Sequence, residues 1–285
     1  MRKIKVPLNY DNKKIITFLL DTYPDLSTNN LYKALRKKDI RINNIKISEN
    51  QEIHENDEIT IYINDDLLFK NDFNIKKIYE DGNILIIDKP FDIEVTASNN
   101  NQLTLTDILK RDYQFIAPCH RLDRNTTGLI IYAKNQKALD ILLDKFKNKE
   151  IKKTYSCTVY GILNKKEATL SDYLFKDSKK STVYISNVKK KGYLEIITKY
   201  KVISEDIKNN TSNLEIELIT GRTHQIRAHL SFIGHPIIGD GKYGKNEINK
   251  KFNVKHQLLD SSKIQFLFKT SAYELDYLNN KTFEK

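Results

Sequence analysis

The feature that most constrains this sequence is a series of apolar, β-branched runs of strand length that follow one another with few helices between them. They are Asn83 to Asp88, Gly128 to Ala133, Thr154 to Tyr160, Tyr193 to Val202 and Asn213 to Thr220. Residues of these types pack well on a pleated, half-buried surface. Because regular intervening helices are lacking, neighbouring strands should pair mainly antiparallel. The pattern predicts an α+β fold with a mixed, mainly antiparallel β-sheet.

The first 65 residues form a separate pattern. Two short helices, predicted around residues 15–20 and 29–38, precede short alternating strands. The residues that follow, 66–74, have no clear period and are typical of a linker. We therefore predict a small α/β domain over residues 1–65, a linker over residues 66–74 and the larger domain over residues 75–285.

Basic residues are concentrated between Leu31 and Ile47. This stretch holds one acid, Asp39, and six basic residues: Lys33, Arg36, Lys37, Lys38, Arg41 and Lys46. Charge concentrated in this way is expected of a surface that binds phosphates. An ordinary solvated helix face is the alternative, because most isolated charge runs have no other role.

Arginine is scarce in this chain, which makes its positions informative. The sequence has 48 Lys and Arg against 37 Asp and Glu, for a net charge of +11, and only 8 of the 48 are Arg. A chain rich in Lys should keep Arg where a planar, permanently charged fork is needed. Four of the eight lie in the short segments 120–128 and 221–227, namely Arg121, Arg124, Arg222 and Arg227. We expect the chemistry of the protein to lie in these two segments.

Asp123 lies between Arg121 and Arg124, just ahead of a predicted strand. Two neighbouring cations favour the ionised form of its carboxylate. An ionised carboxylate can act as a nucleophile, as a base or as an electrostatic partner. A surface ion pair in a loop is the commoner role of an Asp in such a place.

A helix is predicted over residues 223–232, with Arg227 near its start and His224 one turn away. An inward-facing Arg needs an acidic partner or a phosphate, because a buried unpaired charge is costly, and Asp123 is a plausible partner. For His224, His229 and His235 we expect structural hydrogen bonds, because no metal-ligand spacing surrounds them.

The sequence also argues against a membrane protein, a secreted protein and a zinc-binding protein. No run approaches the roughly 20 apolar residues that a membrane span requires, and the first ten residues lack the apolar core of a secretory signal. We therefore expect a cytoplasmic protein without a membrane segment. Cys119 and Cys157 are too few and too far apart for a structural zinc site or a disulfide framework, so no metal is expected.

Both arginine-containing segments resemble the signatures of RluA-type pseudouridine synthases. The first match is residues 120–129, and the second is residues 221–230 with Gly234-His235-Pro236-Ile237 and Gly239-Asp240. Further matches in the family's order are Asp88-Lys89-Pro90, Ala133-Lys134, Lys153-Thr154-Tyr155 and Thr198-Lys199-Tyr200, so the resemblance covers about residues 78–259. Residues 26–59 resemble the small RNA-binding domain named after ribosomal protein S-four.

The family resemblance implies that the protein isomerises uridine in RNA to pseudouridine, with no metal and no cofactor. It implies Asp123 as the nucleophile, attacking either C1′ of the ribose or C6 of the uracil, with Arg227 as its ion-pair partner. Tyr155 would stack on the uracil near the C5 proton, and Arg121 would fill the space that the flipped nucleotide leaves. The other substrate-binding residues that we expect are Arg222, His224 and Ile226, with Lys33, Arg36, Lys37 and Arg41 in the N-terminal domain.

The RNA target is less constrained than the reaction. An added domain of this type occurs in family members that modify large-subunit ribosomal RNA, so we expect 23S ribosomal RNA as the substrate and a monomeric enzyme. Transfer RNA is one alternative. A non-catalytic RNA-binding or ribosome-assembly factor on the same fold is another, although a protein that only binds RNA has no need of Asp123, Tyr155 and Arg227 together.

Overall fold

The computed structural model describes two compact units. The residues that it describes are 1–63, 75–97, 103–254 and 256–285. One unit lies within residues 1–74 and 96–104, and the other within residues 75–95 and 105–285. The predicted linker over residues 66–74 lies outside the described residues. No helix in the described parts of the chain is long and apolar enough to cross a membrane.

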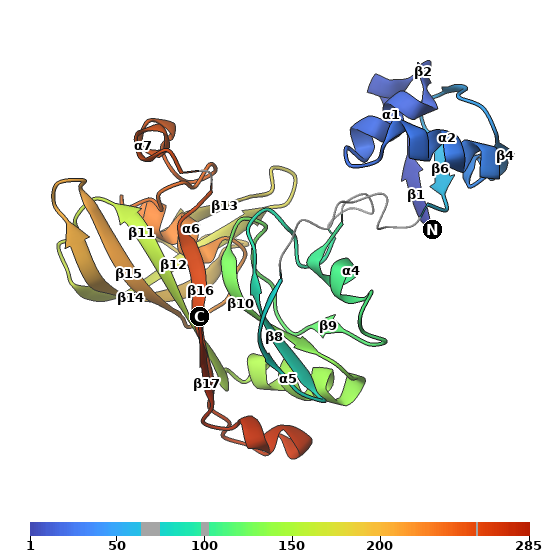
Figure 1. Ribbon diagram of the computed structural model, residues 1–285. Coiled ribbons are helices and arrows are strands. Elements are labelled where there is room, and N and C mark those ends of the chain that lie inside the picture. The colour runs from blue at the N-terminus through green and yellow to red at the C-terminus, as the bar shows by residue number, and fades with distance from the viewer. Residues whose placement is uncertain (64–74, 98–102, 255) are drawn as a thin grey trace. The chain divides into compact units, whose positions relative to one another are not determined.

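The first unit is a small α/β fold around an antiparallel sheet (Figure 1). The sheet order is β1 (Arg2–Lys5), β6 (Glu58–Ile61), β3 (Ile40–Ile42) and β4 (Ile45–Ile47). The other elements are the short pair β2 (Lys13–Lys14) with β5 (Glu52–Ile53), the 3₁₀ turn η1 (Leu8–Tyr10), and helices α1 (Ile15–Thr22) and α2 (Thr28–Lys37). Leu19 and Leu35 of the helices join Ile59 of the sheet in one buried core.

Helix α2 is capped at both ends. The Ser27 hydroxyl accepts a hydrogen bond from the backbone N–H of Asn30 at 3.3 Å, which satisfies one of the free donors at the helix start. The helix ends at Lys38, which takes the left-handed conformation with a φ of 59°. Lys33, Arg36 and Lys37 are exposed on this helix.

The second unit is built on one large sheet. Its main order is β13 (Thr182–Ser186), β12 (Glu167–Asp177), β14 (Leu194–Asp206), β15 (Thr211–Leu218), β11 (Ile151–Tyr160), β16 (Leu259–Phe266), β10 (Thr127–Ala133), β8 (Ile84–Lys89) and β7 (Lys76–Glu80). Strand β17 (Thr282–Glu284) pairs with β16, and β9 (Ala117–Pro118) pairs with β10. Among the described strands only β10 and β16 pair parallel. The predicted α+β fold with a mixed, mainly antiparallel sheet is confirmed.

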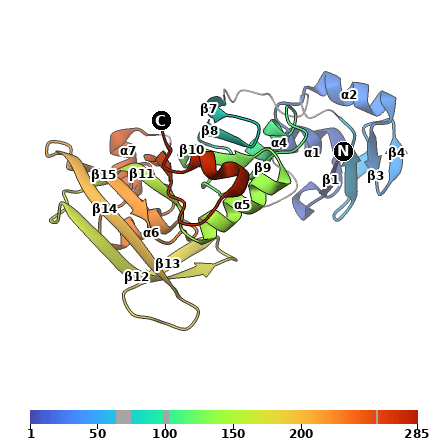
Figure 2. The same cartoon turned by 90° about the horizontal axis from the view of Figure 1, so that it is seen from below.

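Helices cover this sheet at two places. The helices are α4 (Leu105–Leu109), α5 (Gln136–Lys147), α6 (Gln225–Phe232) and α7 (Asn246–Phe252), with the 3₁₀ turn η2 (Tyr273–Leu278). Both views show α5 beside β10, where Ala138 and Leu142 share a core with Ile131 (Figures 1 and 2). Ala228 of α6 instead packs with Ile196 of β14.

The predicted helix over residues 223–232 begins two residues later than expected, at Gln225. His224 takes the left-handed conformation with a φ of 53°, so it lies outside the helix. The Gln225 side chain closes the preceding turn, because its Oε1 accepts the backbone N–H of Arg222 at 3.0 Å and the hydroxyl of Thr220 at 2.9 Å. The helical geometry of α6 therefore does not set the direction of the His224 side chain.

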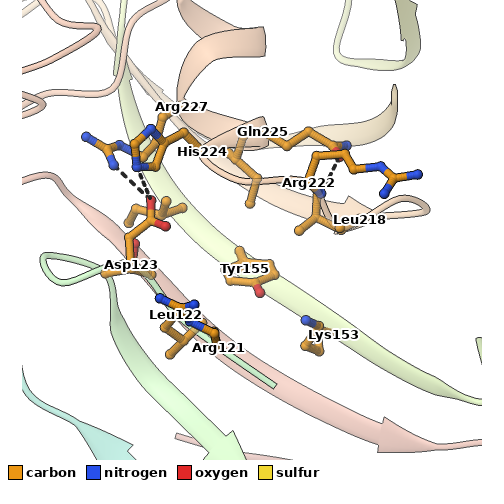
Figure 3. Close-up of a pocket in the computed structure, with 14 residues that line it drawn as sticks. Arg121, Leu122, Asp123, Lys153, Tyr155, Leu218, Arg222, His224, Gln225 and Arg227 are labelled. Carbon is orange, nitrogen blue, oxygen red and sulfur yellow. Dashed lines mark hydrogen bonds and ion pairs between the residues drawn. The ribbon is translucent and has the colours of Figure 1, made fainter. Parts of the chain in front are cut away.

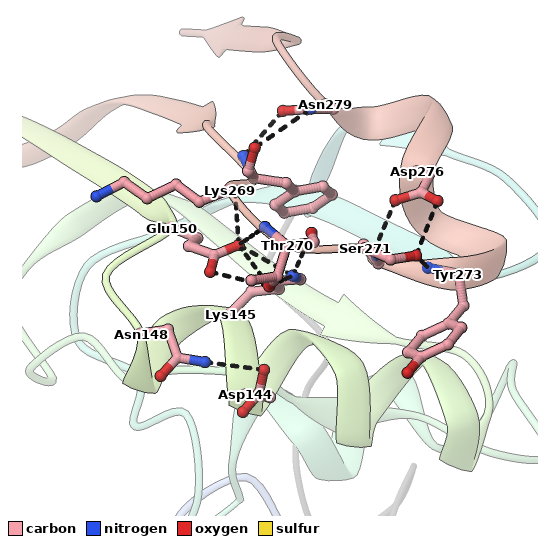
Figure 4. A network of polar contacts seen from close by, with 12 residues as sticks. Asp144, Lys145, Asn148, Glu150, Lys269, Thr270, Ser271, Tyr273, Asp276 and Asn279 are labelled. Carbon is pink, nitrogen blue, oxygen red and sulfur yellow. Dashed lines mark hydrogen bonds and ion pairs between the residues drawn. The ribbon is translucent and has the colours of Figure 1, made fainter.

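A buried ion pair ties α5 to the end of the sheet (Figure 4). Lys145 and Glu150 are 1% and 3% exposed and lie 2.9 Å apart. Lys145 Nζ also donates to the backbone carbonyl of Thr270 at 2.7 Å, and Glu150 accepts the backbone N–H of Lys269 at 3.0 Å. Because both charges are paired and hydrogen-bonded, this network holds the turn between α5 and β11 against the segment that follows β16.

Gly128 is required where β10 meets β16. The parallel register aligns Gly128 with Ser261, and its φ is 104°. A Cβ atom at this position would overlap the Ser261 backbone. Close approach of two backbones and a left-handed φ both favour glycine.

We expect Gly128→Ala to destabilise the second unit by more than about 2 kcal/mol, because strain and overlap act together. The matched control is Gly82→Ala, since a Cβ there meets nothing within 4 Å. Urea unfolding monitored by far-ultraviolet circular dichroism would measure both changes, because the chain has no tryptophan to serve as a fluorescence probe. Equal, small losses at the two positions would show that the β10–β16 contact tolerates a side chain.

Candidate active site

The two arginine-containing segments meet in one pocket of the second unit. One wall is the loop between β9 and β10, which carries Asp123, and another is the loop that leads into α6. The seven residues predicted for the site in this unit all line the pocket: Asp123, Tyr155, Arg227, Arg121, Arg222, His224 and Ile226. Figure 3 labels all of them except Ile226. The other four, Lys33, Arg36, Lys37 and Arg41, belong to α2 and β3 of the first unit.

Arg227 joins two carboxylates from different parts of the chain. Its Nη1 donates to Asp123 Oδ2 at 2.8 Å, while Nε and Nη2 donate to Asp240 Oδ2 and Oδ1 at 2.7 and 3.0 Å. The guanidinium is 9% exposed, the Asp240 side chain is fully buried, and the Asp123 side chain is 26% exposed. The two hydrogen bonds to Asp240 fix the plane of the guanidinium, and the Nη1 hydrogen bond then orients Asp123.

Asp240 is held ionised by its surroundings. Burial alone would raise the pKa of this carboxyl, but the hydrogen bonds and charge of Arg227 hold the pKa below its usual value. The backbone N–H groups of Lys242 and Tyr243 donate to Asp240 Oδ1 at 2.8 and 3.0 Å and act in the same direction. For Arg227, burial opposes the charge, but the two carboxylates outweigh it and raise its pKa above the usual range.

The aromatic ring of Tyr243 lies under the same guanidinium. Arg227 Cζ is 5.3 Å from the ring centre. The Tyr243 hydroxyl contacts His224 Nδ1 at 2.8 Å, and His224 Nε2 lies 3.9 Å from Asp123 Oδ2. Figure 3 shows His224 and Arg227 converging on one oxygen of Asp123. No described residue hydrogen-bonds to the other oxygen, Oδ1.

Buried polar groups hold the loop that carries Asp123. The backbone N–H of Thr126 donates to the carbonyl of Asp123 at 3.1 Å, and Gln257 Nε2 donates to the Thr126 hydroxyl at 2.7 Å. Lys89 is fully buried, and its Nζ donates to the carbonyls of Pro90 and Arg124 at 2.7 and 2.9 Å. Burial lowers the pKa of Lys89 to about 8, although the Asp123 charge opposes this effect. These hydrogen bonds hold in place the loop that carries the Asp123 carboxylate.

Tyr155 provides a buried aromatic surface on β11. It is 4% exposed, and the apolar side chains that line the pocket with it are Leu122, Leu218, Ile226 and Leu259. Burial raises the pKa of the Tyr155 hydroxyl, and the Asp123 charge raises it further, so the phenol keeps its proton at neutral pH. Lys153, two residues earlier, also lines the pocket, and burial lowers its pKa to about 8.

A second, wider groove adjoins the pocket and is strongly basic. Cations from several elements line it, namely Arg121, Arg124, Lys153, Lys176, Arg222, Arg227 and Lys242. Asp123 and Glu94 are the acids in its lining. A groove with this charge attracts a polyanion, while the apolar and aromatic pocket beside Asp123 suits a planar ring.

The residues that contribute to the site but were not predicted from the sequence include Asp240, Lys89, Gln257 and Lys153. Three of them stand in the short motifs of the family resemblance, and that was the available signal. Gln257 follows no such motif. Its contact with Thr126 joins residues 131 positions apart, and such a contact is set by the sheet register and not by local sequence.

The comparisons with known proteins agree on one family. A family model described as RNA pseudouridylate synthase matches residues 83–232. "Ribosomal large subunit pseudouridine synthase C" of Buchnera aphidicola is 32% identical over 281 residues, which cover 92% of this chain and 88% of that protein. "tRNA pseudouridine(32) synthase, mitochondrial" of Saccharomyces cerevisiae is 31% identical over 240 residues, which cover 83% and 52% respectively. The structure of human RNA pseudouridylate synthase domain containing 1 superposes with a TM-score of 0.60 at 24% identity, covering 70% of this chain and 80% of that one.

The buried position of the Arg227–Asp240 pair leads to a stability prediction. Arg227→Met should lower the free energy of unfolding by about 3–5 kcal/mol, because it leaves Asp240 buried without a cation. The loss should shrink as the pH falls through the lowered pKa of Asp240, because the contribution of the ion pair disappears as the carboxylate protonates.

The matched control is Arg124→Met, which breaks the exposed ion pair of Arg124 with Asp92. That pair is equally short, at 2.8 Å, but its side chains are 47% and 55% exposed. It should contribute about 1 kcal/mol or less. Urea unfolding of both variants at several pH values would compare them, and a loss at Arg227 as small as that at Arg124 would contradict the buried-pair interpretation.

Proposed function

The chain belongs to the RluA-type RNA pseudouridylate synthase family, whose members are isomerases acting on RNA, and on this basis we propose a target and a set of residue roles. The target is uridine in large-subunit ribosomal RNA, and the nucleophile is Asp123. The observation that carries the residue roles is the Arg227 bridge, which binds one oxygen of Asp123 and leaves the other without a described partner.

The reaction rearranges bonds without a net change of atoms. The bond between N1 and C1′ breaks, the uracil rotates, and a bond forms between C5 and C1′, with the C5 proton leaving and N1 gaining a proton. Asp123 attacks either C1′ or C6 as an anion, and both routes need an ionised oxygen that faces the base. The Arg227 N–H on Oδ2 would direct Oδ1 towards the pocket.

Tyr155 would form the surface on which the uracil stacks. Its ring is buried beside Asp123, and apolar side chains such as Ile226 and Leu259 surround the same space. The phenol keeps its proton in the resting site, and the expected role of Tyr155 is to stack on the uracil near the C5 proton. A flipped uridine would be held by its face and its edge, as base-modifying enzymes require.

The basic groove would bind the RNA backbone. Arg121 and Arg222 stand at the pocket mouth, where phosphates of the nucleotides next to the target would pass. Arg121 would also fill the space from which the target nucleotide is flipped.

The first unit would add a second contact with RNA, as a domain similar to that of ribosomal protein S-four. Lys33, Arg36 and Lys37 are exposed along α2, and Arg41 stacks over the Tyr62 ring at 4.8 Å. Exposed cations on one helix with a stacked arginine nearby suit phosphates and an adjacent base.

The choice of large-subunit ribosomal RNA is supported by the name of the Buchnera relative, and transfer RNA is the second candidate because the yeast relative is named for it. A map of pseudouridines in total RNA from cells that lack the protein, compared with the parent, would decide. Loss of a pseudouridine confined to ribosomal RNA is the expected result. Loss confined to transfer RNA would contradict the proposed target.

Asp123→Asn should abolish pseudouridine formation and leave RNA affinity within a few-fold of the wild type, because the amide keeps the shape of the side chain but cannot attack as an anion. Release of tritium from C5 of labelled uridine would measure turnover, and filter binding would measure affinity. Turnover at the wild-type rate would overturn the nucleophile assignment.

Replacement of Lys33, Arg36 and Lys37 by Gln in the full chain should weaken RNA binding and reduce its salt dependence. Each lost phosphate contact should lower the log–log slope of affinity against salt by somewhat under about one unit. Binding measured over a range of salt concentrations gives this slope.

The control removes the same charge from elsewhere in the first unit, by changing Lys3, Lys5 and Lys13 to Gln. Its slope should stay close to that of the wild type. Equal slopes for both triple variants would mean that α2 is only a solvated face.

A further inference from the structure

His224 is the one described histidine that faces Asp123, and its two ring nitrogens have different neighbours. Nδ1 lies 2.8 Å from the Tyr243 hydroxyl, and Nε2 lies 3.9 Å from Asp123 Oδ2. The side chain is 15% exposed. Which nitrogen carries the proton therefore decides whether Asp123 faces an N–H donor or a lone pair.

The hydrogen bonds of Tyr243 determine the answer. Its hydroxyl oxygen accepts the backbone N–H of Val183 at 2.9 Å. The phenol keeps its own proton, because burial raises its pKa. The remaining described partner of that proton is His224 Nδ1. When Tyr243 donates this proton to Nδ1, Nδ1 acts as an acceptor and carries no proton. The proton of a neutral His224 ring is then on Nε2.

Burial favours the neutral form of the His224 ring. Burial lowers the pKa of His224 most strongly, and the cations Arg227 and Lys242 lower it further, against the opposing charges of Asp123 and Asp240. A lone pair on Nε2 would repel the Asp123 carboxylate, whereas an N–H attracts it. Hydrogen-bond accounting and electrostatics thus favour the same tautomer.

The backbone of His224 shows that this orientation is imposed. Its φ of 53° lies in the left-handed region, which is uncommon for residues other than glycine, although Asn, Asp and His adopt it more often than the rest. Strain of this kind persists when the surroundings determine it, and it concentrates at functional positions. Here the strained residue directs the ring between Tyr243 and Asp123 instead of continuing α6.

We propose that His224 is a positioning residue that presents an Nε2–H to Asp123 Oδ2, with Tyr243 fixing the tautomer. Together with Arg227 it would occupy Oδ2 from two sides and so direct Oδ1 to the bound nucleotide. At 3.9 Å the contact is longer than a hydrogen bond, and it would tighten when RNA fills the pocket, as catalytic contacts commonly do. The inference rests on Asp123 as the nucleophile.

Two substitutions separate the two sides of the ring. His224→Asn retains an acceptor near the Nδ1 position for Tyr243 but places no N–H near Asp123. His224→Gln reaches the Nε2 position and retains that donor. Asparagine also suits the left-handed backbone better than histidine or glutamine, so a defect of the Asn variant cannot come from added backbone strain.

Single-turnover rates on RNA and binding constants would be measured for both variants. The Asn variant should react about tenfold to a hundredfold more slowly than the wild type, the size of effect expected for a misplaced reacting group. The Gln variant should be faster than the Asn variant, and both should bind RNA with affinities within a few-fold of the wild type. Equal rates for the two variants, or a faster Asn variant, would overturn the proposal.

The tautomer is measured independently of activity by ¹⁵N NMR of the histidine side chains. Nε2 of His224 should have the chemical shift of a protonated nitrogen and Nδ1 that of an unprotonated one. In Tyr243→Phe this difference should shrink, because the donor that selects the tautomer is gone. A proton on Nδ1 in the wild type would overturn the proposal.

Failure of this inference can be distinguished from failure of the proposed function. If Asp123→Asn is inactive but the Asn and Gln variants at His224 react equally, only the role of His224 is withdrawn. If Asp123→Asn reacts normally, the nucleophile assignment fails and the positioning role fails with it.

Discussion

The site of the second unit depends on Arg227, because its buried guanidinium hydrogen-bonds to two carboxylates. Asp240 is wholly buried and takes two of its N–H groups, which compensates the cost of removing the arginine from water. A third N–H then remains for Asp123, which is partly exposed to the pocket. The proposed nucleophile thus derives its orientation from the buried Arg227–Asp240 pair.

The sheet makes this arrangement possible by joining distant parts of the chain. Asp123 and Arg227 are 104 positions apart. Asp123 precedes β10 and Arg227 lies in α6, which follows β15, and these two strands are separated in the sheet only by β11 and β16. Gly128 allows the parallel contact of β10 with β16 just beyond the Asp123 loop. Lys89, at the end of β8, and Gln257, just before β16, donate hydrogen bonds to that loop. A rigid scaffold with its chemistry on supported loops is the common plan of enzyme sites.

Much of this could be predicted from local sequence, and the rest depends on contacts between distant residues. Alternating β-branched runs predicted the strands, and the scarcity of arginine pointed to the two segments that form the pocket. The parallel β10–β16 pair could not be predicted, because pairing of distant strands leaves no local periodic signal. His224 was placed in a helix, since nothing in the pattern shows that the Gln225 side chain closes the turn before it. The role of Asp240 in holding Arg227 required the folded structure, although its motif was visible in the sequence.

The most direct test of this arrangement is a crystal structure of the enzyme with a short RNA that carries 5-fluorouridine at the target position, because fluorine at C5 prevents the final proton loss. We expect the modified nucleotide to be flipped into the pocket over Tyr155, with C1′ or C6 bonded to Asp123 Oδ1 or within about 3.5 Å of it. Oδ2 should remain hydrogen-bonded to Arg227, and Arg227 to Asp240. A nucleotide bonded through Oδ2, or a uracil bound away from Asp123 with the Arg227 bridge broken, would contradict the central claim.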